Sequence, residues 1–283
     1  NPYLRYSFNT ALVIGSVYSR TSTFINPRNL NHQHTIRWNL EESGLLMGRL
    51  GIFKKELRQF VKADWEYTFI AEKPKTSKVF RAFIGVGVPI GKGDSSLPFF
   101  KQYFAGGANS MRGWPIRGIG PGAKPLAPYN SYVLNDRTGD IKIEINGEYR
   151  YDILQIIPNS LALKGALFID AGNVWNYKNS RPGAGTDSLQ FNLKRLYQQL
   201  GVAAGTGFRF DFNYFLIRFD LGFRFKRPDI AKNDGWQIPN ITFANLLKKG
   251  DPVETSPGVY NGYSNRIWRY ENFNFTVGLS YPF

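Results

Sequence analysis

Apolar and polar residues alternate with a period of two along most of this chain. Six segments carry an apolar residue at nearly every second position, with charged residues, polar residues or glycine between them: 62–69, 78–88, 141–150, 208–212, 217–226 and 273–283. In residues 217–226, Phe219 and Leu221 alternate with Asp220 and Gly222. Successive residues of a β-strand point to opposite faces, so each segment predicts a strand with one apolar and one polar face.

The same pattern, followed along the whole chain, predicts about nine strands. Their ranges are 3–17, 33–49, 58–71, 78–91, 140–152, 161–176, 197–212, 214–227 and 271–283. Two connections are long: residues 92–139 are rich in glycine, and residues 228–270 are rich in Pro, Gly and Lys. The others are short, and Asn213 alone nearly joins two strands, while residues 191–200 favour a short helical turn. Long loops at one end and short turns at the other are typical of outer-membrane barrels.

A soluble β-sandwich would show the same alternation, with its apolar faces turned inward. Three features favour a membrane barrel instead. The apolar faces are rich in Phe, Tyr and Trp, the polar faces carry full charges of both signs, and the strand-like runs are about ten residues long. We therefore predict an all-β, antiparallel transmembrane β-barrel. Because an open sheet would expose unpaired backbone groups to lipid, we expect further strands upstream or a second chain that closes the barrel.

Composition and charge bear on the partners of the protein and on its export. The chain has 283 residues, no cysteine, and 36 basic against 21 acidic residues, for a net charge of +15. The basic residues are scattered over strands and loops, which argues against a nucleic-acid partner. Attraction to anionic or phosphate-bearing lipid is favoured, with plain solvation of lumen and loops as the alternative. The N-terminus is strand-like and has no signal peptide, so we expect an exported protein to be represented here in mature or truncated form.

Catalytic and metal-binding residues are sparse. His32 and His34 are the only histidines, and without cysteine or a third histidine they indicate a solvated pair rather than a metal site. No Gly-x-Ser-x-Gly sequence occurs, and nothing places a base beside a nucleophile. We expect no enzymatic activity, no metal and no cofactor.

The most distinctive segment lies in the first long loop. Six glycines lie between residues 100 and 122, around the triplet Arg112-Gly113-Trp114. Glycines in this number indicate tight bends or close backbone approach. The arginine among them is permanently charged and planar, which suits bidentate pairing with a carboxylate.

Four motifs, in this order, resemble the BamA/TamA superfamily of outer-membrane proteins. They are the loop sequence 106–114, the acidic residue Glu148, the Phe-x-Asp-x-Gly sequence 168–172, and the aromatic end Tyr281-Pro-Phe283. The resemblance implies that a loop latch folds back into the lumen, that acceptors on the wall receive it, and that the last strand carries an assembly signal. The implied residues are Arg112, Gly113 and Trp114 for the latch; Glu148, Asp170 and Gly172 for the acceptors; and Phe275, Tyr281 and Phe283 for the signal.

The resemblance also implies a setting and a function. Residues 1–283 would form the C-terminal part of one sixteen-stranded barrel in a Gram-negative outer membrane, with residues 92–139 folding into the lumen and residues 228–270 extracellular. The POTRA domains and opening strands of the family are absent from this chain. The sequence of the loop is closer to that of TamA than to that of BamA. The implied activity is assembly, insertion or translocation of outer-membrane proteins through a lateral seam, without bond chemistry, and the latch would stiffen the wall opposite that seam. The implied partners are unfolded outer-membrane protein clients, membrane lipids including anionic lipopolysaccharide, and a periplasmic or inner-membrane protein.

The alternation supports the latch independently. By parity, Glu148 shares a face with Lys142, and Asp170 shares one with Lys164, so both carboxylates should point into the lumen. The simpler alternative is that Arg112 is solvated and Asp170 caps a turn. For the whole protein, the alternatives are a passive channel or porin, a barrel that carries an enzyme domain upstream, and a soluble basic sandwich that binds polyanions.

Overall fold

A computed structural model describes residues 12–45, 48, 50, 57–91, 95–125, 137–178, 188–212, 214–238, 250–256 and 259–283. Nine strands form one antiparallel sheet in the order β1-β2-β3-β4-β5-β6-β7-β8-β11. Their bounds are β1 Gly15–Asn26, β2 Asn29–Ser43, β3 Phe60–Lys73, β4 Thr76–Pro89, β5 Ile141–Ile157, β6 Leu161–Trp175, β7 Gly201–Asp211, β8 Leu216–Lys226 and β11 Phe273–Leu279. The predicted all-β, antiparallel architecture with nine strands is confirmed.

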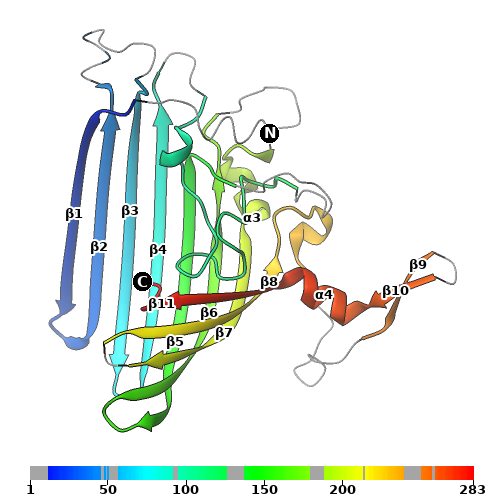
Figure 1. Cartoon of the computed structure of the whole chain (residues 1–283). Coiled ribbons are helices and arrows are strands. Elements are labelled where there is room, and N and C mark those ends of the chain that lie inside the picture. Colours follow the sequence, from blue (N-terminus) through cyan, green and yellow to red (C-terminus); the bar gives the residue numbers. More distant parts are fainter. Residues whose placement is uncertain are drawn as a thin grey trace.

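The sheet is strongly coiled. In Figure 1, β1–β4 stand upright while β8 and β11 lie across the view, and the glycine-rich loop lies on the concave side. Because the strands follow one another in the sheet, alternate connections fall at opposite ends. The short connections at one end are 27–28, 74–75, 158–160 and 212–215, and those at the other end are 44–59, 90–140, 176–200 and 227–272. The predicted segregation of long and short connections is therefore present.

The exposure of the two faces decides between sandwich and barrel. Apolar residues on the outer face are exposed: Ile84 by 44%, Leu167 by 51% and Ile169 by 55%. On the inner face, Glu144 and Asp170 are fully buried. A soluble sandwich would bury its apolar face and expose its charges. The observed arrangement is inverted, so the sandwich alternative is wrong and the apolar face suits lipid.

Several predicted strand bounds differ from the observed ones: the second strand was expected over residues 33–49 and is Asn29–Ser43, the fifth was expected over 140–152 and is Ile141–Ile157, and the first and last strands also differ. The first was expected over residues 3–17, whereas β1 is Gly15–Asn26, and residues 1–11 lie outside the described part of the chain. Its outer face carries Ser16, Arg20 and Ser22, so its alternation is weak. The last strand was expected over residues 271–283, but β11 ends at Leu279. Ser280 has a φ of 61°, in the left-handed region, which turns the following residues out of the alternation.

Smaller elements lie at the end with the long connections. The helical turn expected over residues 191–200 is present as η3 (Leu193–Arg195) and α3 (Leu196–Gln199). The long connection before β11 contains η4 (Lys232–Gly235), the hairpin β9 (Pro252–Ser256) and β10 (Val259–Tyr263), and the helix α4 (Ser264–Asn272). Parts of the two predicted long loops, 92–94, 126–136, 239–249 and 257–258, lie outside the described residues, as does Asn213. None of the helices described is long and apolar enough to cross a bilayer.

Candidate functional site

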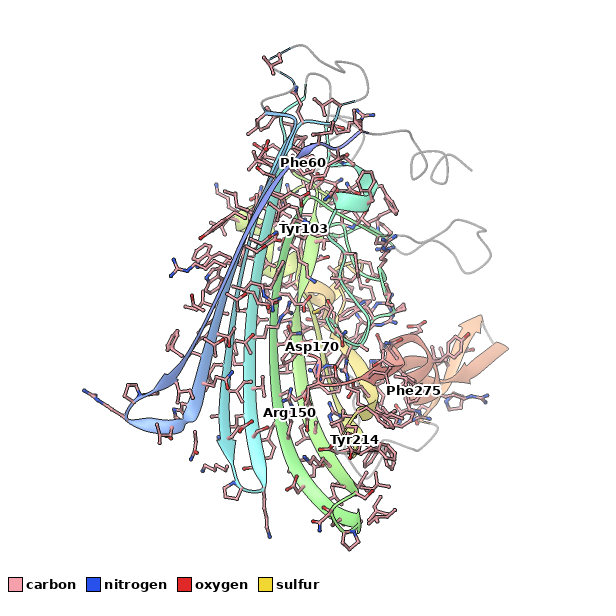
Figure 2. The ribbon with its side chains drawn as sticks, turned by 60° about the vertical axis from the view of Figure 1, so that its left-hand side comes forward. Phe60, Tyr103, Arg150, Asp170, Tyr214 and Phe275 are labelled. Carbon is pink, nitrogen blue, oxygen red and sulfur yellow. The ribbon has the colours of Figure 1, made fainter. Side chains whose placement is uncertain are left out.

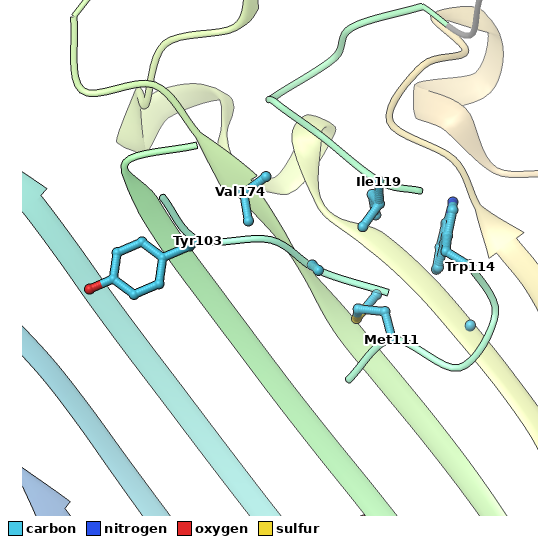
Figure 3. Close-up of a cluster of buried hydrophobic side chains, with 7 residues drawn as sticks. Tyr103, Met111, Trp114, Ile119 and Val174 are labelled. Atoms are coloured by element: carbon cyan, nitrogen blue, oxygen red, sulfur yellow. The ribbon is translucent and has the colours of Figure 1, made fainter. Parts of the chain in front are cut away.

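The glycine-rich loop packs against the inner wall. It begins near η1 (Phe99–Lys101) and contributes most of a buried apolar cluster that is completed by the wall. Figure 3 shows this cluster, which consists of Tyr103, Ala105, Met111, Trp114 and Ile119 of the loop with Val174 of β6 and Ala203 of β7. Gly106 and Gly107 have φ of 106° and 89°, which a residue with a side chain rarely adopts. These two glycines therefore allow the turn that brings the loop back onto the wall.

At the tip of the loop, Arg112 pairs with two carboxylates of the wall. Its Nε and Nη2 donate to the two oxygens of Asp170 at 2.9 and 2.8 Å, and its backbone N–H donates to Asp170 Oδ2 at 2.9 Å. Its Nη1 donates to Glu148. All three side chains are fully shielded from solvent. We call Arg112, Glu148 and Asp170 the tip latch.

The surroundings keep Arg112 charged. Burial opposes its charge, but Asp170 and Glu148 outweigh burial and raise the pKa of Arg112 above its usual value. The guanidinium carbon lies 3.7 Å from the centre of the Phe168 ring, a cation–π contact from the same wall. Arg112 therefore stays cationic in the latch.

Further charges extend the tip latch across the wall. Glu148 also accepts from Arg150 at 2.7 Å and from Arg209 at 3.3 Å. Arg209 Nη1 lies 2.9 Å from Asp220, a distance that makes an ion pair although the angle does not suit a hydrogen bond. Taking such charges out of water costs about as much as their attraction returns, so the network fixes geometry more than it adds stability.

The other predicted latch residues lie close to the wall. Gly113 fits against Ala203, where an added Cβ would have no room, and its carbonyl accepts from Arg224 Nε at 2.6 Å. Trp114 is 3% exposed and packs on Gly201. Gly172 pairs in register with Glu144 of β5, and a Cβ added at Gly172 would lie 2.6 Å from the carbonyl oxygen of Ile143 and 3.0 Å from Cα of Glu144.

The three residues of the predicted assembly signal point in different directions. Phe275 is 52% exposed on the outer face and stacks on Phe219, with ring centres 6.2 Å apart. Tyr281 lies on the inner side, where the Arg150 guanidinium is 4.1 Å from its ring centre. Phe283 lies 5.8 Å from the Arg112 guanidinium. Figure 2 shows Arg150, Asp170 and Phe275 along the sheet.

A second attachment of the loop was missed by the sequence analysis. Lys101 pairs with Glu41 of β2, and the Tyr103 hydroxyl donates to Asp64 of β3. Leu97 and Tyr103 lie over Gly87 and Gly85 of β4, where added Cβ atoms would collide with them. We call these residues the base anchor: Leu97, Lys101 and Tyr103 of the loop with Glu41, Asp64, Gly85 and Gly87 of the wall.

Burial shapes the chemistry of the base anchor. Burial, and then the hydrogen bond to Asp64, raise the pKa of Tyr103, so its hydroxyl stays a donor. Lys62 Nζ lies 4.1 Å from the centre of the same ring. The two inward glycines in the alternation of β4 were the available sequence signal, because glycine on a wall face leaves room for a neighbour. In Figure 2, Tyr103 lies nearer than Asp170 to the end with the long connections.

The two histidines lie on the outer face of β2. His34 Nδ1 is 2.8 Å from the Tyr67 hydroxyl, and its ring stacks on Phe24 with centres 5.1 Å apart. Among the residues that the structure describes, no group of His, Cys, Asp and Glu is arranged to hold a metal ion.

The tip latch and the base anchor together hold the loop on the inner wall through charge pairs and packing.

This chain resembles known proteins both in a domain model and in a solved structure. Residues 9–281 match the model of the Omp85 superfamily domain. Among solved structures, the chain aligns with BamA from Haemophilus ducreyi lacking POTRA domains 1-3, at 13% identity and a TM-score of 0.40. The alignment covers 95% of this chain and 55% of that BamA chain, so this chain spans about half of its length. The narrower likeness to TamA stays a prediction. With a domain model matched over nearly all of its residues, the chain belongs to the Omp85 superfamily.

Proposed function

We propose that this chain is the C-terminal part of an outer-membrane β-barrel that assembles, inserts or translocates other outer-membrane proteins in a Gram-negative bacterium. Residues 1–283 would belong to one barrel domain, with residues 92–139 in its lumen, residues 228–270 on the extracellular side and POTRA domains upstream. The assembly signal would be Phe275, Tyr281 and Phe283. Its superfamily membership supports this proposal at the level of protein class.

The observation that carries the proposal is the buried tip latch. A passive channel needs an open lumen, whereas the loop that carries Arg112 packs on the inner wall and both of its acceptors are fully buried. A lumen occupied by a firmly held loop suits a barrel that works through its wall. At one edge of the sheet, β11 pairs with β8 alone among the described strands, and such an edge can accept an incoming strand.

The proposed partners follow from the surfaces. Unfolded outer-membrane proteins would be the clients, since a free strand edge recognises extended backbone. The exposed aromatic outer face suits membrane lipid, and the net charge of +15 favours anionic lipid such as lipopolysaccharide. A periplasmic or inner-membrane partner would be reached through the upstream domains.

Reconstitution tests this proposal. The protein in liposomes should speed the folding of an unfolded outer-membrane client, followed by the shift in gel mobility that folded barrels show without heating. Ion conductance through the same liposomes should be small and intermittent, because the loop obstructs the lumen. Large, steady conductance with the loop intact, together with no faster client folding than in empty liposomes, would favour a passive channel and refute the proposal.

A further inference from the structure

The tip of the loop touches the last strand of the sheet as well as the strands that hold the Arg112 side chain. Asn274, on the inner face of β11, donates from Nδ2 to the carbonyl oxygen of Arg112 at 2.9 Å. Asn274 pairs in register with Gly222 of β8, where an added Cβ would lie 2.7 Å from the same oxygen. The missing side chain at Gly222 lets the backbone of the tip come close enough for Asn274 to reach it.

A buried arginine lies between the tip and β11. Arg218 of β8 is fully buried and donates to Asn109 of the loop and, at 3.0 Å, to Asp220. Its guanidinium lies against Gly278 of β11, where an added Cβ would be 2.6 Å from Nε. One side chain therefore contacts the loop and the backbone of the terminal strand at once.

A second arginine makes a similar link at the start of β11. Arg224 Nε donates to the carbonyl oxygen of Gly113 at 2.6 Å. Its Nη1 donates to the carbonyl oxygen of Glu271 at 3.3 Å, in the last turn of α4 just before β11. The tip is thus linked to both halves of the terminal strand through Asn274, Arg218 and Arg224.

The terminal strand is short and lies at an edge of the sheet. With seven residues, β11 is the shortest strand of the nine-stranded sheet, and in the described part of the chain it pairs with β8 alone. Meanwhile the Arg112 guanidinium is held on β5 and β6, at Glu148 and Asp170. A single loop residue therefore connects the middle of the sheet to its last strand.

We propose that the seated loop tip clamps β11, with Asn274 and Arg218 as positioning residues. The order of the terminal strand then depends on the tip latch, and the seating of the tip depends on the terminal strand. This coupling concerns the position of a strand, so it does not depend on the proposed function. It also places the latch at the terminal strand itself, in addition to the wall that the sequence analysis expected it to stiffen.

Hydrogen exchange of the β11 amides, followed by mass spectrometry on the protein in micelles, tests the clamp. Asn274→Ala should speed exchange in β11 by about fivefold, the factor that corresponds to one typical hydrogen bond. The matched control is Thr276→Ala on the same face of the same strand, because Thr276 Oγ1 has no hydrogen-bond partner among the described atoms. In an Arg112→Ala background, Asn274→Ala should add little, since the clamp is already open.

The coupling must also act in the other direction, because coupling between two sites is reciprocal. Asn274→Ala should raise the rate of tryptic cleavage at Arg112 by a factor similar to that in β11, whereas Thr276→Ala should not. This measurement does not use Arg112→Ala, so it decides the question even if that variant fails to fold. The clamp would be overturned if Asn274→Ala and Thr276→Ala changed exchange and cleavage equally, or if Asn274→Ala sped β11 exchange without speeding cleavage at Arg112. It would also be overturned if the effects of Asn274→Ala and Arg112→Ala on β11 exchange multiplied in the double variant, as independent effects do.

Discussion

The loop is attached to the wall at two places, and the two attachments differ in kind. At the tip latch, full charges are buried on both sides and the geometry is bidentate. At the base anchor, Leu97 and Tyr103 fill space above glycines, and Lys101 with 28% of its side chain exposed pairs with Glu41. Buried charge pairs specify position at little net gain, whereas each buried large apolar side chain contributes about 1.5–3 kcal/mol. The ion pairs of Arg112 therefore decide where the loop lies, and apolar packing, both at the base and at Met111 and Trp114 beside the tip, supplies more of the energy.

The largest effect should come from Arg112→Ala at the tip. Glu148 and Asp170 would stay buried without their cation, which costs about 3–5 kcal/mol of unfolding free energy. We expect a barrel that assembles poorly or a loop that proteases cleave, seen by gel mobility without heating and by limited proteolysis. Arg112→Lys, which keeps the charge and loses the bidentate geometry, should fall between wild type and Arg112→Ala. Normal gel mobility and unchanged loop cleavage in Arg112→Ala would contradict the latch.

Gly85→Ala should break the base while leaving the tip seated. The new Cβ would meet the rigid Tyr103 ring at 2.6 Å, and overpacking of this kind costs about 1–3 kcal/mol. The expected result is cleavage near residues 97–104 with normal protection at Arg112. Gly147→Ala is the control, because its Cβ would lie on the outer face, 3.3 Å from Ile169. If Gly85→Ala released the tip as readily as the base, the two attachments would be one unit.

Tyr103→Phe separates packing from hydrogen bonding within the base. The ring still fills the space above Gly85, and Asp64 keeps a donor in Asn39 Nδ2 at 3.0 Å. We expect a loss of about 1 kcal/mol in unfolding free energy, typical of a single hydrogen bond. The urea concentration at which the unheated gel mobility is lost measures it. A loss as large as that of Gly85→Ala would show that the hydroxyl, rather than the packing, holds the base.

The smallest effect should come from Lys101→Ala. Its ion pair with Glu41 is partly exposed, and such pairs contribute about 0–1 kcal/mol. The urea midpoint should shift little, and less in high salt, where exposed pairs are screened. A shift that rivalled Arg112→Ala would erase the distinction between a tip that specifies position and a base that packs.

Much of the fold could be predicted because the decisive pattern is local. Ile84 and Arg81 fall on opposite faces by parity alone, and the structure exposes the first and buries the second. The first strand was predicted too early in the chain, over residues 3–17, because Arg20 occupies an outer position of β1 and weakens its alternation. The inward turn after Leu279 depends on the backbone angle of Ser280, which no periodic pattern reveals.

The candidate site could likewise be predicted only in part from local patterns. Parity placed Glu148 and Asp170 on the inner wall, and the motif of the loop pointed to Arg112. The base anchor could not be predicted from the sequence, because Tyr103 and its acceptor Asp64 are 39 residues apart and belong to no common motif. The contacts with β11 join residues still farther apart in the sequence, since Asn274 follows Arg112 by 162 residues.

That separation has a consequence for biogenesis. Because Asn274 lies in β11, 162 residues after Arg112, the hydrogen bond between them can form only after β11 has been made and has paired with β8. Contacts between such distant residues form late and slowly. Full protection of the tip would then come after β11 has docked, and protease resistance of the tip would report that this strand is in place.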